Sequence, residues 1–380
     1  MKIRILIVIL ALIVILNHCK TPDNNKAGNK LTSKRIVDLD ENKAAAVSFK
    51  FNKRVNVVDV TSPKIAISKG ADKIYVYGDS AIRGKKSFII KMYNNKLEYI
   101  SQKLFHKGQG PGDVGLTNVV TPTEENIFIC ENSNLRVSIY ENDFKYIKSV
   151  KFYRNSTYPF ELIENGRFFV GSKLVYPKNR LDAYSFNIVS FPKIRAKELY
   201  QTEPYYPRDE KRRFLLGEYT EFFYFYKNKD IYLLLMKKYQ ILKYDLSGKK
   251  IDDLTLKVRD IVTPKDKEKQ FLEEQGFRNR SNSFGFSKTV TPTSVMVPLN
   301  KGFIVIRRED YSTECNGLVD GDYFSYQLTF VGKVKVPCFF DIYKITGGMP
   351  TISNKYDNNY LYLVNEVEED CFLEKWEVKE

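Results

Sequence analysis

The pattern of hydrophobic and polar positions predicts a chain built almost entirely of β-strands. Similar units start near Ile74, Ile127, Phe168, Ile231, Phe303 and Tyr360. Each unit contains a polar residue, an apolar strand, a short connection, an alternating strand, a turn and a short outer strand. The units recur about every 40–70 residues, and a four-stranded antiparallel blade needs about 40–50 residues. The sequence therefore predicts an all-β fold, a six-bladed β-propeller, with a pair of stacked β-sheets as the alternative.

An isolated strand before the first unit is expected to close the ring. Ala46–Phe51 alternates between apolar and polar residues and is followed by the first blade. A propeller commonly closes when an N-terminal strand pairs with its last blade, because closure removes the open sheet edges. The last unit ends with the strand Phe372–Val378. The propeller is therefore expected to span residues 46–380.

A glycine-rich segment carries a resemblance to a known group of propellers. His106–Asp113 reads HKGQGPGD, which resembles the GxGPGxF segment of NHL-like six-bladed propellers, especially bacterial lipoproteins of that type. Val114 stands where that segment has Phe. The resemblance implies an inter-blade turn, in which glycines adopt positive φ and proline fixes the backbone. A phosphate-binding loop is the other interpretation, but the segment precedes no helix and lacks a Lys-Ser/Thr pair.

Two insertions interrupt the blade spacing. Pro204–Phe214 is basic and aromatic, and a short helix is predicted near 263–276, with Thr263 as N-cap and Gly276 at its end. We expect both insertions on one rim, where they form a cationic, aromatic ligand-binding surface. The candidate ligand-binding residues are Tyr205, Tyr206, Arg208, Lys211, Arg212, Arg213, Arg278 and Arg280. The alternative is a solvated loop that Phe214 anchors to the core.

The N-terminus predicts export. Residues 1–18 combine basic residues with an apolar run from Ile5 to Leu16, which is typical of a signal peptide. Leu16–Cys19 resembles the lipobox of bacterial lipoproteins, although His18 departs from the small residue usual there. The resemblance implies cleavage before Cys19, lipidation of Cys19 and residence in the bacterial cell envelope, periplasmic or surface-exposed. Residues 19–45 would then form the lipidated N-terminus and a flexible tether. An uncleaved anchor and a plain secretory signal are the alternatives.

Net charge and cysteine content say little about the partner and the disulfides. The formal net charge is +15, including Lys2 and Arg4 of the leader. Such charge favours an anionic partner, although the frequent Lys, Asn, Ile and Tyr also suit the ordinary composition of a low-GC genome. An exported compartment permits disulfides, and we favour a pair between Cys315 and Cys338, which can flank one hairpin. Buried thiols are the alternative.

Candidate chemistry is sparse. Removal of the leader leaves His106 as the one histidine, which excludes histidine-rich metal sites and makes histidine-based acid–base catalysis improbable. Some six-bladed propellers hold a central calcium ion, and Asp79, Glu131, Asn132 and Asn134 are candidates for such a site here, although these residue types also form turns.

Two functional hypotheses follow. The first is an envelope-anchored, non-enzymatic binding or scaffold module for a protein, a peptide or an anionic glycan, held to the membrane by its lipid. The second is a calcium-dependent hydrolase or lyase with its site in the central channel. Nucleic-acid binding conflicts with the export signal. We expect no catalytic residues and no cofactor unless calcium binds.

Overall fold

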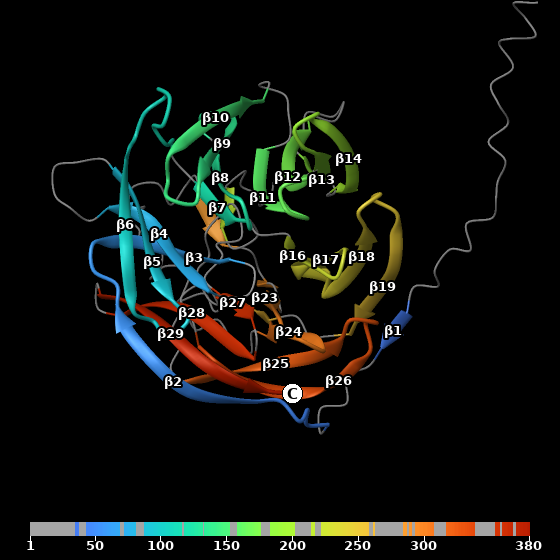
Figure 1. Ribbon diagram of the computed structural model, residues 1–380. Coiled ribbons are helices and arrows are strands. Elements are labelled where there is room, and N and C mark those ends of the chain that lie inside the picture. The colour runs from blue at the N-terminus through green and yellow to red at the C-terminus, as the bar shows by residue number, and fades with distance from the viewer. Residues whose placement is uncertain are drawn as a thin grey trace, which may run out of the picture. The chain divides into compact units, whose positions relative to one another are not determined.

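The computed structural model divides the chain into residues 1–34 and residues 35–380 (Figure 1). The residues it describes are 35–37, 43–68, 72–80, 87–115, 118–131, 133–152, 158–175, 183–201, 214–216, 222–257, 261–262, 284–286, 289–290, 293–307, 317–338, 354–357, 359–367 and 370–380. Cys19 and the predicted helix near 263–276 lie outside these ranges. Within them, no helix is long and apolar enough to cross a membrane.

The second unit forms a ring of six four-stranded antiparallel sheets, a six-bladed β-propeller (Figure 1). Blade 1 contains β3 (Val60–Ile67), β4 (Lys73–Ser80), β5 (Ser87–Asn94) and β6 (Tyr99–His106). Blade 2 contains β7 (Asn118–Pro122), β8 (Asn126–Glu131), β9 (Arg136–Glu141) and β10 (Tyr146–Lys151). Blade 3 contains β11 (Tyr158–Ile163), β12 (Phe168–Val175), β13 (Ala183–Ser190) and β14 (Arg195–Gln201).

The second half of the ring follows the same order. Blade 4 contains β16 (Phe222–Lys227), β17 (Asp230–Leu235), the 3-10 helix η1 (Met236–Lys238), β18 (Gln240–Asp245) and β19 (Lys250–Leu256). Blade 5 contains β23 (Thr293–Pro298), β24 (Gly302–Arg307), β25 (Leu318–Ser325) and β26 (Phe330–Pro337). Blade 6 contains β27 (Asn354–Asp357), β28 (Tyr360–Val367), β29 (Asp370–Lys379) and, from the N-terminal side, β2 (Ser48–Asn56).

The six strand starts predicted from the sequence are confirmed. Each one falls at or next to the start of the second strand of a blade, in β4, β8, β12, β17, β24 and β28. These second strands are the clearest in the sequence because both of their faces are covered by neighbouring blades. In β4, for example, Ile74, Val76 and Tyr77 are fully buried. Continuous burial produces an unbroken apolar run rather than simple alternation.

A repeated turn links the third and fourth strands of four blades. Leu97, Phe144, Gly248 and Leu328 occupy the same position, each with a positive φ and a backbone N–H that donates to the carbonyl oxygen three residues earlier. Leu97, Phe144 and Leu328 are also buried beneath their turns. In these three turns the apolar side chain fixes the turn to the core. The common backbone geometry shows that the four turns are equivalent although their residues differ.

The predicted closing strand is confirmed. β2 pairs with β29 in antiparallel register, from Ser48 opposite Lys379 to Asn56 opposite Phe372. Arg54 donates to the carboxylate of Glu374 from Nε, at 2.8 Å, and from Nη2. Glu374 is only 1% exposed, and its other carboxylate oxygen accepts the indole N–H of Trp376 at 2.9 Å.

Part of the segment assigned to the tether is ordered against the ring. β1 (Arg35–Val37) pairs in parallel with β19, the outer strand of blade 4. Ala44 forms a parallel bridge with Lys333, and the Ala45 N–H donates to the Lys333 carbonyl oxygen at 2.7 Å. The chain therefore contacts the propeller before the closing strand begins. Hydrophobic periodicity could not identify this three-residue strand.

Candidate functional site

The glycine-rich segment connects blade 1 to blade 2, as predicted for an inter-blade turn. Gly112 has a φ of +79°. The Gly110 N–H donates to the carboxylate of Asp113 at 3.0 Å, and a Cβ atom at Gly108 would lie 2.4 Å from that carboxylate. His106 is exposed at the end of β6, and its carbonyl oxygen accepts the Val114 N–H at 2.8 Å. Gly112 is thus favoured by its positive φ, while a side chain at Gly108 would displace the Asp113 carboxylate.

A buried ion pair between Glu131 and Arg136 stabilises this turn. Glu131 is fully buried and accepts hydrogen bonds from Arg136 Nε, the Gly115 N–H and the Asn134 side-chain amide, each at 2.8–2.9 Å. The Arg136 guanidinium in turn donates to the carbonyl oxygens of Gln109, Gly110 and Asp113. A buried carboxylate and guanidinium need such partners on every side. This network explains the turn as a structural element.

The candidates for calcium binding belong largely to the same region. Glu131 and Asn134 are engaged in the turn network, and Asp79 forms an ion pair with Lys107 at 2.7 Å. Asn132 lies outside the described residues. Among the side chains that the structure describes, no group of three or more His, Cys, Asp or Glu residues could hold a metal ion.

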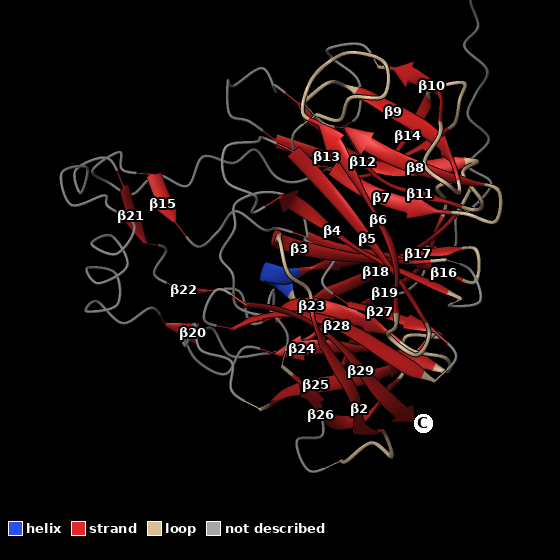
Figure 2. Ribbon diagram, turned by 60° about the vertical axis from the view of Figure 1, so that its left-hand side comes forward, coloured by secondary structure: helices blue, strands red, loops and turns tan. Residues whose placement is uncertain are grey.

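Short strands next to the two predicted insertions pair with each other through their backbones. The first contributes β15 (Phe214–Leu216), and the second contributes β20 (Ile261–Val262), β21 (Phe284–Phe286) and β22 (Thr289–Val290). β15 and β21 pair in parallel, with Phe214 opposite Phe284, while β20 pairs antiparallel with β22. Both insertions connect the outer strand of one blade to the inner strand of the next, and Figure 2 shows their strands projecting on the same side of the ring. These strands flank the two predicted insertions, whose own residues 205–213 and 263–280 lie outside the described residues, so their shared rim stays a prediction.

The candidate binding residues of this rim are not placed by the structure. Tyr205, Tyr206, Arg208, Lys211, Arg212, Arg213, Arg278 and Arg280 all lie outside the described residues. The neighbouring run Phe222–Tyr226 is a core strand, since it forms most of β16 and its first four residues are buried. The structure therefore pairs strands that flank the two insertions, and the ligand-binding role of these eight residues stays a prediction.

The central channel contains a pocket of about 310 Å³ that sequence reasoning did not identify. It is lined by the ends of the innermost strands β7, β11 and β16 with the turns that follow them, and by Met296 and Pro298 of β23. The ends of these innermost strands lead into the second strands of their blades. Each insertion instead leads into the beginning of an innermost strand, β16 or β23. The pocket therefore lies toward the rim opposite to the insertions.

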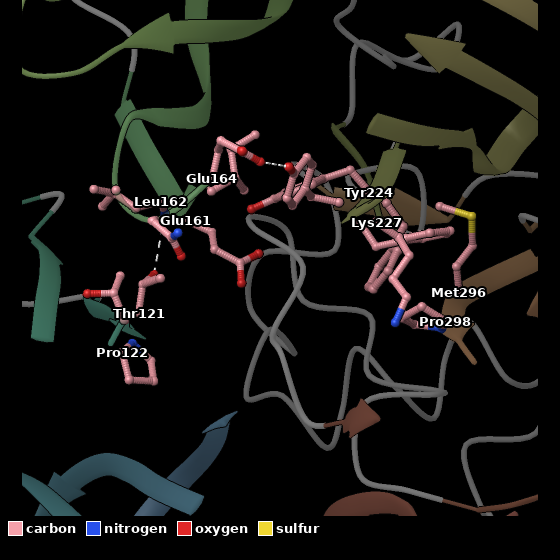
Figure 3. Close-up of a pocket in the computed structure, with 16 residues that line it drawn as sticks. Thr121, Pro122, Glu161, Leu162, Glu164, Tyr224, Lys227, Met296 and Pro298 are labelled. Atoms are coloured by element: carbon pink, nitrogen blue, oxygen red, sulfur yellow. Dashed lines mark hydrogen bonds between the residues drawn. The ribbon is translucent and has the colours of Figure 1, made fainter. Parts of the chain in front are cut away.

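Polar and apolar groups share the pocket wall (Figure 3). Glu161 extends from β11 toward the middle of the pocket, and Lys227 and Met296 lie on the far side. The Tyr226 hydroxyl donates to the Glu164 carboxylate, which joins blade 3 to blade 4. Burial raises the pKa of Tyr226, and the Glu164 hydrogen bond and charge raise it further. Tyr226 thus remains protonated and keeps Glu164 in place.

The innermost tyrosine of this wall is also protonated. Burial raises the pKa of Tyr224 well above its usual value, and the negative charge of Glu161 adds to the effect. Across the blade 2–blade 3 boundary, the Leu162 N–H donates to Thr121 Oγ1 at 3.3 Å. The described wall of the pocket thus carries hydroxyl groups and carboxylates beside its apolar side chains. A carboxylate directly before the turn into an apolar second strand is the sequence signal that points to this site.

The cysteines divide into two groups. Cys130 and Cys371 are buried as thiols, and burial raises the pKa of Cys130 well above its usual value, with the charges of Glu161 and Glu131 contributing. Cys338 is disulfide-bonded. Cys315 lies outside the described residues, so the pairing of Cys315 with Cys338 stays a prediction.

Comparisons with known proteins support the fold alone. No family model and no curated protein matches the sequence. A member of the DUF4221 family from Bacteroides vulgatus has a similar structure, with a TM-score of 0.56 and 12% identity over 89% of this chain and 99% of that chain. A protein from Bacteroides fragilis aligns with a TM-score of 0.47 and 10% identity, covering 91% of this chain and 99% of that chain. The first likeness agrees with the propeller architecture, while the finer NHL-like resemblance stays an expectation.

Proposed function

We propose that this protein is a lipid-anchored, non-enzymatic binding module of the bacterial envelope that recognises an anionic partner with its insertion-bearing rim. The observation that carries the proposal is the pairing of β15 with β21, which joins two insertions from consecutive blade connections. Ordering a residue costs about 1–2 kcal/mol, so paired insertions imply a compensating use. Binding sites commonly occupy such loops on a rigid scaffold.

Charge suggests the chemistry of the partner. The chain has a net charge of +15, and the two insertions contain Arg208, Arg212, Arg213, Arg278 and Arg280. Guanidinium groups bind carboxylates, sulfates and phosphates through paired hydrogen bonds. The proposed partner is therefore an envelope protein or peptide with an acidic surface, or an acidic glycan. Attachment at Cys19 would keep the module at the membrane surface.

Binding of a sulfated polysaccharide tests the proposal with a probe of defined charge. We expect full-length protein in detergent to bind heparin, with affinity that falls as ionic strength rises. The triple variant Arg208→Ala, Arg212→Ala, Arg213→Ala should bind at least tenfold more weakly and show a flatter salt dependence. The matched control removes three exposed lysines from turns on the opposite rim, namely Lys96, Lys145 and Lys249.

The control separates a local site from general charge. If both triple variants lose the same affinity, binding reflects the net charge of the chain, and the rim proposal is wrong. An arginine variant with unchanged affinity contradicts it as well. Circular dichroism and thermal denaturation of each variant establish that the ring remains folded.

A further inference from the structure

Three consecutive blades expose large apolar side chains on their outer strands. These strands are β2 in blade 6, β6 in blade 1 and β10 in blade 2, and they lie along one side of the ring (Figure 1). Most of the exposed large apolar side chains among the described residues lie on these strands or on the connection from β2 to β3, and each is 44–57% exposed: Phe51, Val58, Tyr99, Ile100, Leu104 and Ile147. Clustered apolar exposure of this kind marks an interaction surface.

The same three strands carry cations and no carboxylates. None of them contains Asp or Glu. By contrast, β14 in blade 3 contains Glu198, and β19 in blade 4 contains Asp252 and Asp253. We call the outer surface of β2, β6 and β10 the lysine-apolar wall, and its exposed lysines are Lys50, Lys53, Lys103, Lys148 and Lys151. Its charge is complementary to an anionic surface.

Bulges in the wall strands oppose the docking of a strand from another protein. The register of β6 against β5 skips Ile100, and that of β10 against β9 skips Ile147. The register of β2 against β29 shifts between Phe51 and Lys53. A bulge interrupts the row of hydrogen-bonding groups along a sheet edge, so it disfavours strand addition. A fluid surface can instead meet apolar and cationic side chains that are spread over three blades.

We propose that the lysine-apolar wall binds an anionic lipid bilayer, with its lysines at the lipid headgroups and its apolar side chains at the boundary between headgroups and acyl chains. Basic and apolar side chains together hold proteins to such bilayers. This inference rests on the membrane attachment in the proposed function, because a lipid at Cys19 would bring the wall to the bilayer. Contact through the outer wall leaves the insertion-bearing rim open to its partner.

Tryptophan quenching by brominated lipids tests the proposal on the full chain in vesicles of phosphatidylcholine and phosphatidylglycerol. Ile147→Trp places the reporter in the wall. The matched control is Ile251→Trp, because Ile251 is 37% exposed and is the residue that the register of β19 against β18 skips. Its neighbours are acidic instead of basic. The wild type, with Trp376 as its one tryptophan, gives the background signal. We expect quenching at position 147 to be at least fivefold stronger than at position 251.

Removing the lysines tests whether their charge holds the wall to the bilayer. The changes Lys103→Gln, Lys148→Gln and Lys151→Gln, made together in Ile147→Trp, should reduce quenching in the anionic vesicles at least threefold, because each lysine near an anionic leaflet strengthens binding. Vesicles of neutral phosphatidylcholine should reduce it similarly without these changes.

The matched charge control removes exposed lysines from blades 3 and 4, namely Lys193, Lys197 and Lys249. These changes in Ile147→Trp should leave the quenching unchanged. Equal quenching at positions 147 and 251, or no quenching at position 147, overturns the proposal and indicates a protein as the occupant of the wall. An equal loss in both lysine variants overturns it as well. The comparison of the two tryptophan positions remains decisive if a lysine variant does not fold.

Cosedimentation with neutral vesicles distinguishes this result from failure of the proposed anchor. If the protein pellets with neutral vesicles but shows no quenching at position 147 in anionic ones, the anchor holds and the wall proposal is wrong. If the protein stays in the supernatant with neutral vesicles, the anchor is wrong, and quenching at position 147 in anionic vesicles still supports the wall. Neither measurement involves the arginines of the insertion rim.

Discussion

The ion pair between Arg54 and Glu374 provides the sharpest test of ring closure. These residues lie directly opposite each other on β2 and β29. Glu374 is almost completely buried, while the Arg54 side chain is 49% exposed. Removing Arg54 leaves the buried carboxylate with the indole N–H of Trp376 as its side-chain donor among the described residues. The variant Arg54→Met retains an apolar stem and removes the guanidinium.

The expected cost follows from the burial of the two partners. Removing one partner of a fully buried ion pair costs about 3–5 kcal/mol. Half of the arginine is in solvent, where water screens the interaction and can partly replace it, so we reduce this value to about 2–3 kcal/mol. Unfolding entropy of about 2.1 cal/mol/K per residue over residues 46–380 converts that cost to a Tm decrease of about 3–4 °C.

The second substitution distinguishes an unpaired charge from lost packing. Adding Glu374→Gln to Arg54→Met should raise the Tm above that of Arg54→Met alone, because a buried amide costs less than a buried, unpaired carboxylate. Lys50→Met, an exposed change on the same strand, is the control and should shift the free energy of unfolding by less than about 0.5 kcal/mol. Thermal and urea denaturation measure all three. The reasoning is refuted if Arg54→Met has the Tm of the wild type. It is also refuted if the double variant is no more stable than Arg54→Met.

Three further predictions concern the anchor, the glycine turn and a buried acid. Cys19→Ala should move the protein from the detergent phase to the aqueous phase in Triton X-114 partitioning, and unchanged partitioning would contradict lipidation. Gly112→Ala should cost about 1–2 kcal/mol because φ is +79° there, although the nearest side-chain atom is 3.8 Å away; an unchanged denaturation midpoint would show that the turn tolerates a side chain. Burial raises the pKa of Asp322, so the folded state holds that proton more tightly, and unfolding free energy should decrease as pH rises from below the ordinary aspartate pKa through the raised one. Asp322→Asn should remove this slope in denaturation series from about pH 3 to about pH 7, and an identical slope in the variant would contradict the assignment.

The sequence was most informative where burial dictates residue type. The second strands of the blades lie between neighbouring blades, so their apolar runs are long and clear, and all six starts were identified. The closing strand was visible because its alternation stands alone before the first blade, although β2 begins at Ser48 and extends to Asn56. Turn residues and core composition therefore predict the architecture well.

The pocket residues were harder to predict because their role depends on contacts between residues far apart in the sequence. Glu161 and Glu164 look like ordinary polar residues around a turn, and they line a common pocket only because β11 and β16 face the same channel. The Tyr226–Glu164 hydrogen bond spans 62 positions of sequence. Glu131 was considered for calcium, but its role depends on Arg136 and Gly115, which periodicity cannot place around it. Local patterns predict strands, while the ring arrangement creates the pocket.

Photo-crosslinking in intact cells tests the central claim, that the insertion-bearing rim meets an envelope partner. A photoreactive phenylalanine analogue would replace Tyr205 in the first insertion, and the same analogue at Asn95, in an exposed turn at the opposite rim, would serve as the control. We predict that the analogue at position 205 forms a discrete conjugate with an envelope protein or glycan, and that added heparin reduces the yield of this conjugate. The analogue at position 95 should form no such conjugate. A conjugate formed equally from both positions, or from Asn95 alone, would contradict recognition by this rim.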